Sequence, residues 1–252
     1  MRMRITALTD RGHEREHNED CVGWNGWSMT GGRANPLVFE FDVVQPTVVV
    51  VCDGMGGHAG GSTASRIAAE MLSTPEWFVS TGIAHGQLTE RIQHVSDRLN
   101  DLSGARSELT GMGCTAVGAV VHPDGSALVF NVGDSRCYRI EGRYLAQLTV
   151  DHRRSGTNVL TQALGGGRRL IVEPDFFECA VPEAPGLLLS TDGLDDYATQ
   201  DAIEELAIEN RPDLAVRLRD LALAGGGGDN VTIVQLEYIR PVGAVAIEEH
   251  HG

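Results

Sequence analysis

Val48-Val49-Val50-Val51-Cys52 runs directly into Asp53-Gly54-Met55-Gly56-Gly57-His58, and this stretch decides the fold. The unbroken apolar run predicts a strand, which we expect to begin near Val43 and to carry Asp53 out of a sheet into a tight turn. Gly54 would leave its backbone carbonyl open to approach. A carboxylate at a strand end beside a free carbonyl is typical of a hard-oxygen site for Mg²⁺ or Mn²⁺.

Three other acidic motifs are spread along the chain: Asn18-Glu19-Asp20, Asp192-Gly193 and Asp229-Asn230. Each motif alone is weak, because Asp and Gly together are first of all a turn signal. The four motifs lie far apart in sequence, so only a folded core could bring them into one site.

The composition indicates one globular domain, which we place at residues 1–240 and follow with a polar tail at 241–252. No run of about 18 apolar residues is present, which argues against a membrane span. The basic start is cut off by polar residues before it could serve as a signal peptide. We therefore expect a cytoplasmic monomer.

The formal net charge is −15, which argues against nucleic acid as a partner because phosphates reward a basic surface. The five cysteines are odd in number and well separated. Most of them stand in apolar runs, so we expect reduced core thiols rather than a disulfide framework.

Periodicity and turn signals predict the order of the elements. We expect strands at 3–8, 43–52, 114–121, 127–132, 136–140, 144–148, 187–190 and 231–238. We expect helices at 87–101, 158–164, 201–208 and 212–223, and another that Ser62 caps, whereas residues 23–36 are interpreted as an irregular excursion. Strands in hairpin series and helices in pairs favour an α+β fold over a doubly wound one.

The acidic motifs belong to a longer ordered pattern. It consists of Thr9-Asp10-x-Gly12-x-x-Arg15-x-x-Asn18-Glu19-Asp20, Asp53-Gly-Met-Gly-Gly-His-x-Gly-Gly61, Gly111-Met-Gly-Cys-Thr115, Val132-Gly-Asp-Ser-Arg136, Leu148-Thr-x-Asp-His152, Ser190-Thr-Asp-Gly-Leu194 and Gly228-Asp-Asn-Val-Thr232. From about Ile5 to Leu236 the chain resembles the bacterial branch of the PP2C-like metal-dependent Ser/Thr protein phosphatases.

The resemblance implies a four-layer α/β/β/α sandwich with two central, mainly antiparallel sheets and a metal centre at one end. Asp53 would bridge two Mg²⁺ or Mn²⁺ ions with help from the Gly54 carbonyl. Asp192 and Asp229 would complete the pair, and Asp20 would act directly or through water. Two ions about 3.5–4 Å apart need several carboxylates to offset their charge, and their bridging water could attack phosphorus in line. No phosphoenzyme is required.

Arg15 stands at the family's arginine position, five residues before Asp20. Its planar fork can hold two phosphate oxygens at once, so we predict a phosphate clamp there. The resemblance also implies that Asp134, together with Asp192, helps to hold a third and weaker ion. We expect Asn230 to orient Asp229, and Thr115 and Ser135 to be structural.

The chain departs from the family in three places. Met55 stands where relatives outside the bacterial branch carry a proton-donating histidine, and His58 is interpreted as a turn residue. Only residues 153–156 separate His152 from Thr157, so we expect this chain to lack the mobile flap of the bacterial members, which normally helps to hold the third ion. We hypothesise that residues 24–36, with Trp24 and Trp27, partly replace the flap as a substrate-facing wall.

One further motif is misleading. Residues 137–143 match the Cys-x5-Arg pattern of cysteine-dependent phosphatases. That chemistry needs a thiolate below a loop of backbone N–H groups leading into a helix. We expect a strand entering a Glu-Gly turn here instead.

The resemblance implies hydrolysis of phosphoserine and phosphothreonine in proteins, in opposition to bacterial-type Ser/Thr kinases. Two alternatives stay open. The missing flap is shared with phosphatases that act on anti-sigma-factor antagonists in partner-switching pathways. A pseudophosphatase that only binds phosphoproteins would normally lose metal carboxylates, and none is lost here.

Overall fold

The computed structural model describes residues 1–32, 35–74, 85–141, 143–167 and 169–240. One six-stranded sheet, the β5 sheet, runs in the order β13 (Asp175–Ala180), β9 (Ser126–Val132), β8 (Ala116–Val121), β5 (Thr47–Cys52), β2 (Cys21–Trp24), β3 (Trp27–Met29). The other, the β1 sheet, runs β11 (Tyr144–Gln147), β10 (Arg136–Glu141), β14 (Leu187–Ser190), β15 (Val231–Tyr238), β1 (Arg2–Asp10), β4 (Leu37–Asp42). A small third sheet runs β12 (Leu164–Gly165), β7 (Gly113–Cys114), β6 (Gly54–Met55).

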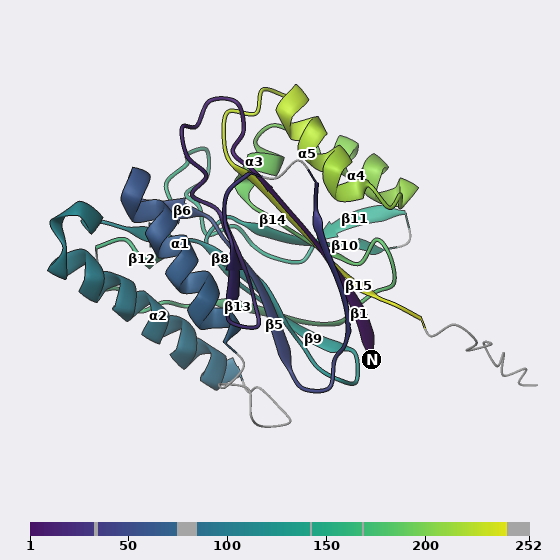
Figure 1. Ribbon diagram of the computed structural model, residues 1–252, viewed down its shortest axis with the longest axis horizontal. Coiled ribbons are helices and arrows are strands. Elements are labelled where there is room, and N and C mark those ends of the chain that lie inside the picture. The colour runs from purple at the N-terminus through teal and green to yellow at the C-terminus, as the bar shows by residue number, and fades with distance from the viewer. Residues whose placement is uncertain (33–34, 75–84, 142, 168, 241–252) are drawn as a thin grey trace, which may run out of the picture.

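The two large sheets pack face to face, and helices cover their outer faces (Figure 1). The helices are α1 (His58–Ser73) and α2 (His85–Ala105) on the β5 sheet, and α4 (Gln200–Glu209) and α5 (Leu214–Ala224) on the β1 sheet. The strand pairs within each sheet are antiparallel. The predicted α+β sandwich of four layers is therefore confirmed.

The valine run of β5 explains why the strand lies at the centre of the molecule. Val48, Val50 and Cys52 point into the core under α1 and α2, whereas Val49 and Val51 point into the core between the sheets. Because successive side chains of a strand face opposite ways, a strand with helices on one side and a sheet on the other is apolar throughout.

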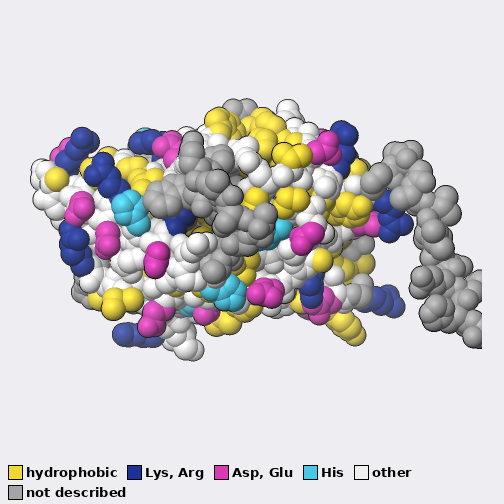
Figure 2. Space-filling model, turned by 90° about the horizontal axis from the view of Figure 1, so that it is seen from below, with side chains coloured by type: hydrophobic (Ala, Val, Ile, Leu, Met, Phe, Trp, Pro, Cys, Tyr) yellow, Lys and Arg dark blue, Asp and Glu magenta, His cyan; other side chains and the backbone are white. Residues whose placement is uncertain are grey.

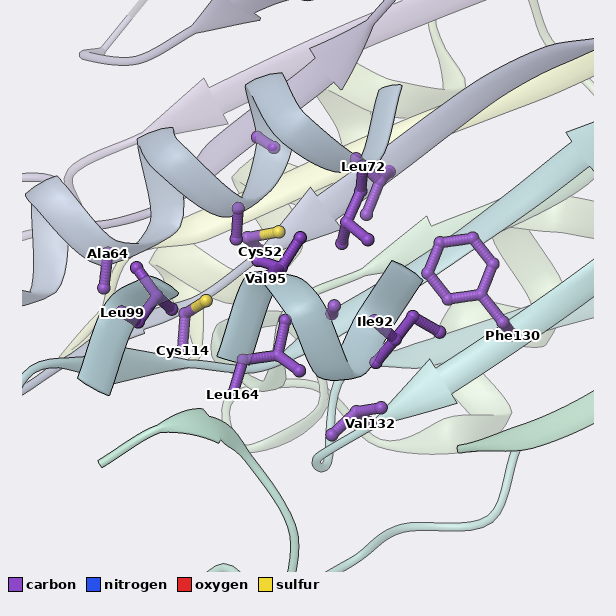
Figure 3. Packing of buried hydrophobic residues seen from close by; sticks show 14 of the residues in the cluster. Cys52, Ala64, Leu72, Ile92, Val95, Leu99, Cys114, Phe130, Val132 and Leu164 are labelled. Carbon is purple, nitrogen blue, oxygen red and sulfur yellow. The ribbon is translucent and has the colours of Figure 1, made fainter. Parts of the chain in front are cut away.

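The helix α2 packs along one apolar face. Figure 3 shows Ile92, Val95 and Leu99 from this helix among Phe130 and Leu164. These positions recur three or four residues apart, so they share one side of the helix. The predicted helix at 87–101 is confirmed and extends further at both ends.

Two helix predictions were wrong. Helix α1 begins at His58 after Gly57, so Ser62 lies inside the helix instead of capping it. Residues 158–164 form no helix, because the chain there bridges back to Arg153 and then enters β12. The strand predicted from Val43 begins only at Thr47.

The excursion at residues 23–36 is more regular than predicted. β2 and β3 form a hairpin beside β5, and β4 follows on the opposite sheet. The ring of Trp24 lies 4.9 Å from those of Phe39 and Phe41, centroid to centroid, where the edges of the two sheets meet. The strand β13 was also missed.

Acidic and basic side chains are interspersed on the face shown in Figure 2, with small groups of hydrophobic side chains among them. The negative charge of the chain is therefore not gathered into one patch on that face. None of the helices in the described part of the chain combines the length and the apolar character needed to cross a bilayer.

Candidate metal centre

A cavity of about 630 Å³ lies at one end of the sandwich. The loop after β1, the strand β6 and the short helix α3 (Asp192–Asp195) meet at this end (Figure 1). Six of the predicted site residues line the cavity: Arg15, Asp53, Gly54, Asp134, Asp192 and Asp229. The folded chain thus brings together motifs that are scattered through the sequence.

Asp53 leaves the end of β5 as predicted. Its backbone is fixed by Thr115, whose hydroxyl accepts from Asp53 N (3.1 Å) and whose N–H donates to Asp53 O (2.9 Å). Next to it, a Cβ on Gly54 would lie 2.3 Å from Gly61 O and 2.6 Å from Glu19 O. Only glycine fits this close approach of three backbone segments.

Asp20 does not line the cavity but is completely buried behind it. Its Oδ2 accepts hydrogen bonds from the hydroxyls of Thr191 (2.9 Å) and Thr232 (2.7 Å). Asn18 donates to Thr9, whose hydroxyl lies 2.7 Å from that of Thr232. Side chains from β1, from β15 and from the residue that follows β14 thereby fix one carboxylate.

Asp192 opens the helix α3, with only Thr191 between it and the end of β14. A Cβ on the following Gly193 would lie 1.9 Å from Asn230 O, so the Asp192 and Asp229 turns touch through their backbones. The carboxyl groups of Asp53 and Asp192 lie close enough for each to shift the pKa of the other. Protonation of one of them is the expected response to crowded negative charge.

Asp229 is held from both sides. Its Oδ1 accepts from the backbone N–H of Asn230 (2.8 Å) and its Oδ2 from the Arg15 guanidinium (2.6 Å). The Asn230 side chain does something different: it accepts from Glu19 N and donates to the carbonyls of Arg11 and His17. Asn230 thus orients Asp229 through its backbone and fixes the 11–19 loop through its amide.

Burial raises the pKa values of the grouped carboxyls. It raises the pKa of Asp20 to about 7 against the lowering effect of the two threonine hydroxyls, and the pKa of Asp192 also to about 7, where Asp134 and Asp229 add to the shift. Burial, then the charges of Asp20, Asp192 and Asp229, raise the pKa of Asp53 well above its usual range. These groups are therefore stabilised by any cation that enters the cavity.

The donor chemistry fits a hard divalent ion. Within the described part of the chain no three His, Cys, Asp or Glu side chains already form a group that could hold a metal ion. Two buried oxygens that such an ion would satisfy, Asp20 Oδ1 and Asp192 Oδ1, have no hydrogen-bond partner. An ion that takes Asp229 Oδ2 would also have to displace the Arg15 contact, and any protonated carboxyl among its ligands would lose its proton.

A short turn occupies the place where the resemblance implies a flap. Arg153 bridges to Leu160, and Arg154 N donates to Val159 O (2.9 Å). His152 joins the turn to β13 and to the loop after β9, because its ring contacts Asp175 and accepts from Gly133 N. Asp134 follows Gly133 and lies 3.7 Å from the Arg153 guanidinium.

The secondary predictions are mixed. Met55 lines the cavity, and His58 begins α1 with its side chain outside the described residues. Trp24 and Trp27 do not line the cavity, so the proposed substrate wall is wrong for these two side chains.

Cys137 lies within β10, and burial raises the pKa of its thiol, as expected for a misleading Cys-x5-Arg match. All five cysteines are unpaired, as predicted.

Sequence reasoning missed the two threonines that hold Asp20. Thr191 and Thr232 are buried and each stands beside a motif residue: Thr191 before Asp192, and Thr232 two positions after Asn230. A buried carboxylate needs such donors. The need of a buried carboxylate for donors could have pointed to these threonines. Nothing in the sequence, however, shows that Asp20 is buried.

Comparisons with known proteins agree with this arrangement. Residues 39–220 match the sequence pattern of the family described as Protein phosphatase 2C. The serine/threonine phosphatase stp of Listeria monocytogenes is 34% identical over 260 residues, covering 93% of this chain and 96% of its own length. Crystal structures of Stp1 from Staphylococcus aureus (28% identity, TM-score 0.75, covering 94% of this chain and 95% of that one) and of PstP/Ppp from Mycobacterium tuberculosis (27%, 0.74, 95% and 100%) are similar in fold. The chain therefore belongs to the protein phosphatase 2C family.

Proposed function

We propose that this protein is a metal-dependent phosphatase that hydrolyses phosphoserine and phosphothreonine in other proteins. The observation that carries the proposal is the convergence of Asp53, Asp192 and Asp229 on one cavity, with Asp20 buried behind them. Two buried carboxylate oxygens without hydrogen-bond partners, on Asp20 and Asp192, would be available as ligands for Mg²⁺ or Mn²⁺. The names of the similar serine/threonine phosphatases support the same substrate class.

Each residue has a distinct part in this mechanism. Two divalent ions, when bound, would lower the pKa of a water nucleophile and offset the charge of the phosphoryl oxygens. Asp53, Asp192, Asp229 and the Gly54 carbonyl would hold the ions, with Asp20 acting directly or through water. Arg15, whose side chain is 55% exposed, would turn from Asp229 to grip two phosphate oxygens. The substrates would be phosphorylated proteins, Ser/Thr kinases among them.

Hydrolysis of a phosphothreonine peptide with Mn²⁺ or Mg²⁺ tests the proposal. We expect turnover that EDTA abolishes, that Asp53→Asn removes and that okadaic acid leaves unchanged. Trp27→Ala, on the aromatic contact with Phe39, is the matched control and should retain turnover.

Two results would contradict it. Binding of phosphopeptide without turnover under any metal condition would favour a pseudophosphatase. Turnover confined to phosphorylated anti-sigma-factor antagonists would favour the partner-switching alternative.

A further inference from the structure

Arg153 is surrounded by carboxylates beside the candidate metal centre. Its guanidinium nitrogens lie 3.7 Å from Asp134 Oδ2, 3.6 Å from Asp196 Oδ1 and 4.0 Å from Asp151 Oδ2. Asp134 lines the cavity, whereas Arg153 is not among the lining residues. The arginine therefore contacts a cavity-lining carboxylate without lining the cavity itself.

The neighbouring arginine already neutralises two of the carboxylates in this region. Arg136 donates to both oxygens of Asp151 (3.0 Å from Nε and 2.8 Å from Nη2) and pairs with Asp195 at 3.1 Å. Arg153 is therefore the positively charged partner of the other two carboxylates, those of Asp134 and Asp196. Both of these carboxylates raise the pKa of Asp192, so they belong to the same electrostatic group as the metal centre.

The short turn fixes where the Arg153 charge lies. His152 N donates to Gly133 O (2.9 Å), and Thr161 N donates to His152 O (2.8 Å). Because Gly133 precedes Asp134, the backbone holds Arg153 next to its partner. The Arg153 side chain is only 22% exposed, which strengthens its pairing relative to a surface ion pair.

We propose that the Arg153 guanidinium is the resident cation between Asp134 and Asp196 and keeps a third divalent ion out of this position. The inference rests on the proposed function and narrows it, since the chain would then bind two ions. Arg153 acts through Asp134 and Asp196, whose carboxylates it holds, and not by contact with substrate. A covalently attached charge is present at every metal concentration, so the site would not depend on a weakly held ion.

Counting bound Mn²⁺ tests this inference independently of activity. Free Mn²⁺ would be followed by electron paramagnetic resonance during titration of the full chain. We expect two ions for the wild type, and a third, weaker one for Arg153→Gln, because Asp134 and Asp196 are left without a cation. Arg153→Lys keeps the charge and should stay at two. Arg154→Gln, on the exposed neighbour in the same turn, is the matched control and should also stay at two.

The double variant Arg153→Gln/Asp134→Asn removes both charges. It should return the count to two and restore any melting temperature lost by Arg153→Gln in EDTA. The double variant remains informative if the single variant unfolds, because a third ion bound to it would overturn the inference.

Other outcomes are decisive as well. A third Mn²⁺ in the wild type, or two ions in a folded Arg153→Gln variant, would overturn the inference and leave the proposed function standing. A raised KM for phosphopeptide in Arg153→Gln at an unchanged count of two would assign Arg153 to substrate instead. A wild type that binds no Mn²⁺ would overturn the proposed function together with this inference.

Discussion

Arg15 donates a hydrogen bond of 2.6 Å to Asp229, although 214 positions separate the two residues. The predicted phosphate clamp thus contacts a predicted metal ligand. A divalent ion that takes Asp229 Oδ2 would compete with the guanidinium and release it toward the cavity, so metal binding and phosphate binding are expected to be coupled.

Arg15→Ala should lower kcat/KM for a phosphothreonine peptide about 10- to 100-fold, the size expected when a charged hydrogen-bond donor is lost. Arg15→Lys should recover only part, since an ammonium cannot hold two oxygens in a fork. Mn²⁺ affinity should stay the same or rise, because Asp229 loses a competing partner. Steady-state kinetics and a Mn²⁺ titration check both points, with Arg11→Ala as the control. A large fall in Mn²⁺ affinity would show that Arg15 supports the metal site instead.

Asp53→Asn should abolish hydrolysis and, in EDTA, raise the melting temperature. Asp53 lies among Asp20, Asp192 and Asp229, and the charges of all three raise its pKa. Removing one carboxyl from a crowded acidic site relieves repulsion that only a cation would otherwise offset. Differential scanning fluorimetry in EDTA measures the effect, and a lower melting temperature than wild type would contradict this explanation.

The metal-free protein should become less stable as the pH rises from 6 to 8. The pKa values of Asp20 and Asp192 are raised to about 7 in the folded chain, whereas the unfolded chain loses these protons near pH 4. Between these values the folded state binds more protons, so the free energy of unfolding falls with increasing pH. Thermal melts in EDTA should show this decline, and Mn²⁺ should reduce it. The melting temperature of Asp192→Asn should depend less on pH. A wild-type melting temperature at pH 8 that equals or exceeds the one at pH 6 would contradict the raised pKa values of Asp20 and Asp192.

Asn230→Ala should lower stability by about 1–3 kcal/mol, the cost of leaving buried polar groups unsatisfied. The amide joins Glu19 N and the carbonyls of Arg11 and His17, so its loss should also loosen Arg15 and raise KM. Asn230→Asp keeps the acceptor for Glu19 N but loses both donors. Its second oxygen would instead face the two carbonyls, so urea unfolding should place Asn230→Asp at or below the alanine variant. An alanine variant as stable as wild type would refute the role of the amide.

Gly193→Ala should prevent folding or cost several kcal/mol, because its Cβ would lie 1.9 Å from Asn230 O. The control is Gly104→Ala near the end of α2, where an added Cβ meets nothing within 4 Å. That change should raise stability by about 0.5–1 kcal/mol through helix propensity. Equal melting temperatures for the two variants would contradict the close packing of the Asp192 and Asp229 turns.

The predictable parts of the molecule were those with a local signal. The valine run fixed β5 and the exit of Asp53, and Leu187–Ser190 was predicted residue for residue as β14. β4 was missed although Leu37–Asp42 alternates partly buried and exposed positions, because the Gly-rich stretch before it favoured a loop. The helix expected at 158–164 failed because Leu160 bridges to Arg153 and Leu164 pairs with Cys114, and these tertiary contacts override local propensity.

Side-chain partners between distant segments could not be predicted. Nothing in the local sequence around Arg153 indicates that Asp134 and Asp196 face it, since those contacts depend on how three loops pack. The same holds for Thr191 and Thr232 around Asp20. The resemblance to the family implied a set of site residues. The structure adds the hydroxyl donors and the arginine side chains that hold the carboxylates of that set in place.

The pairing of β1 with β15 has a consequence for synthesis on the ribosome. β1 is made well before β15, yet the two strands lie side by side along eight registered pairs. Asp20 accepts a hydrogen bond from the hydroxyl of Thr232 in β15, and Asp229 stands just before that strand. A nascent chain therefore cannot assemble its carboxylate cluster until β15 has emerged. Each copy of the protein should therefore lack a complete carboxylate cluster until β15 has been made and has paired with β1.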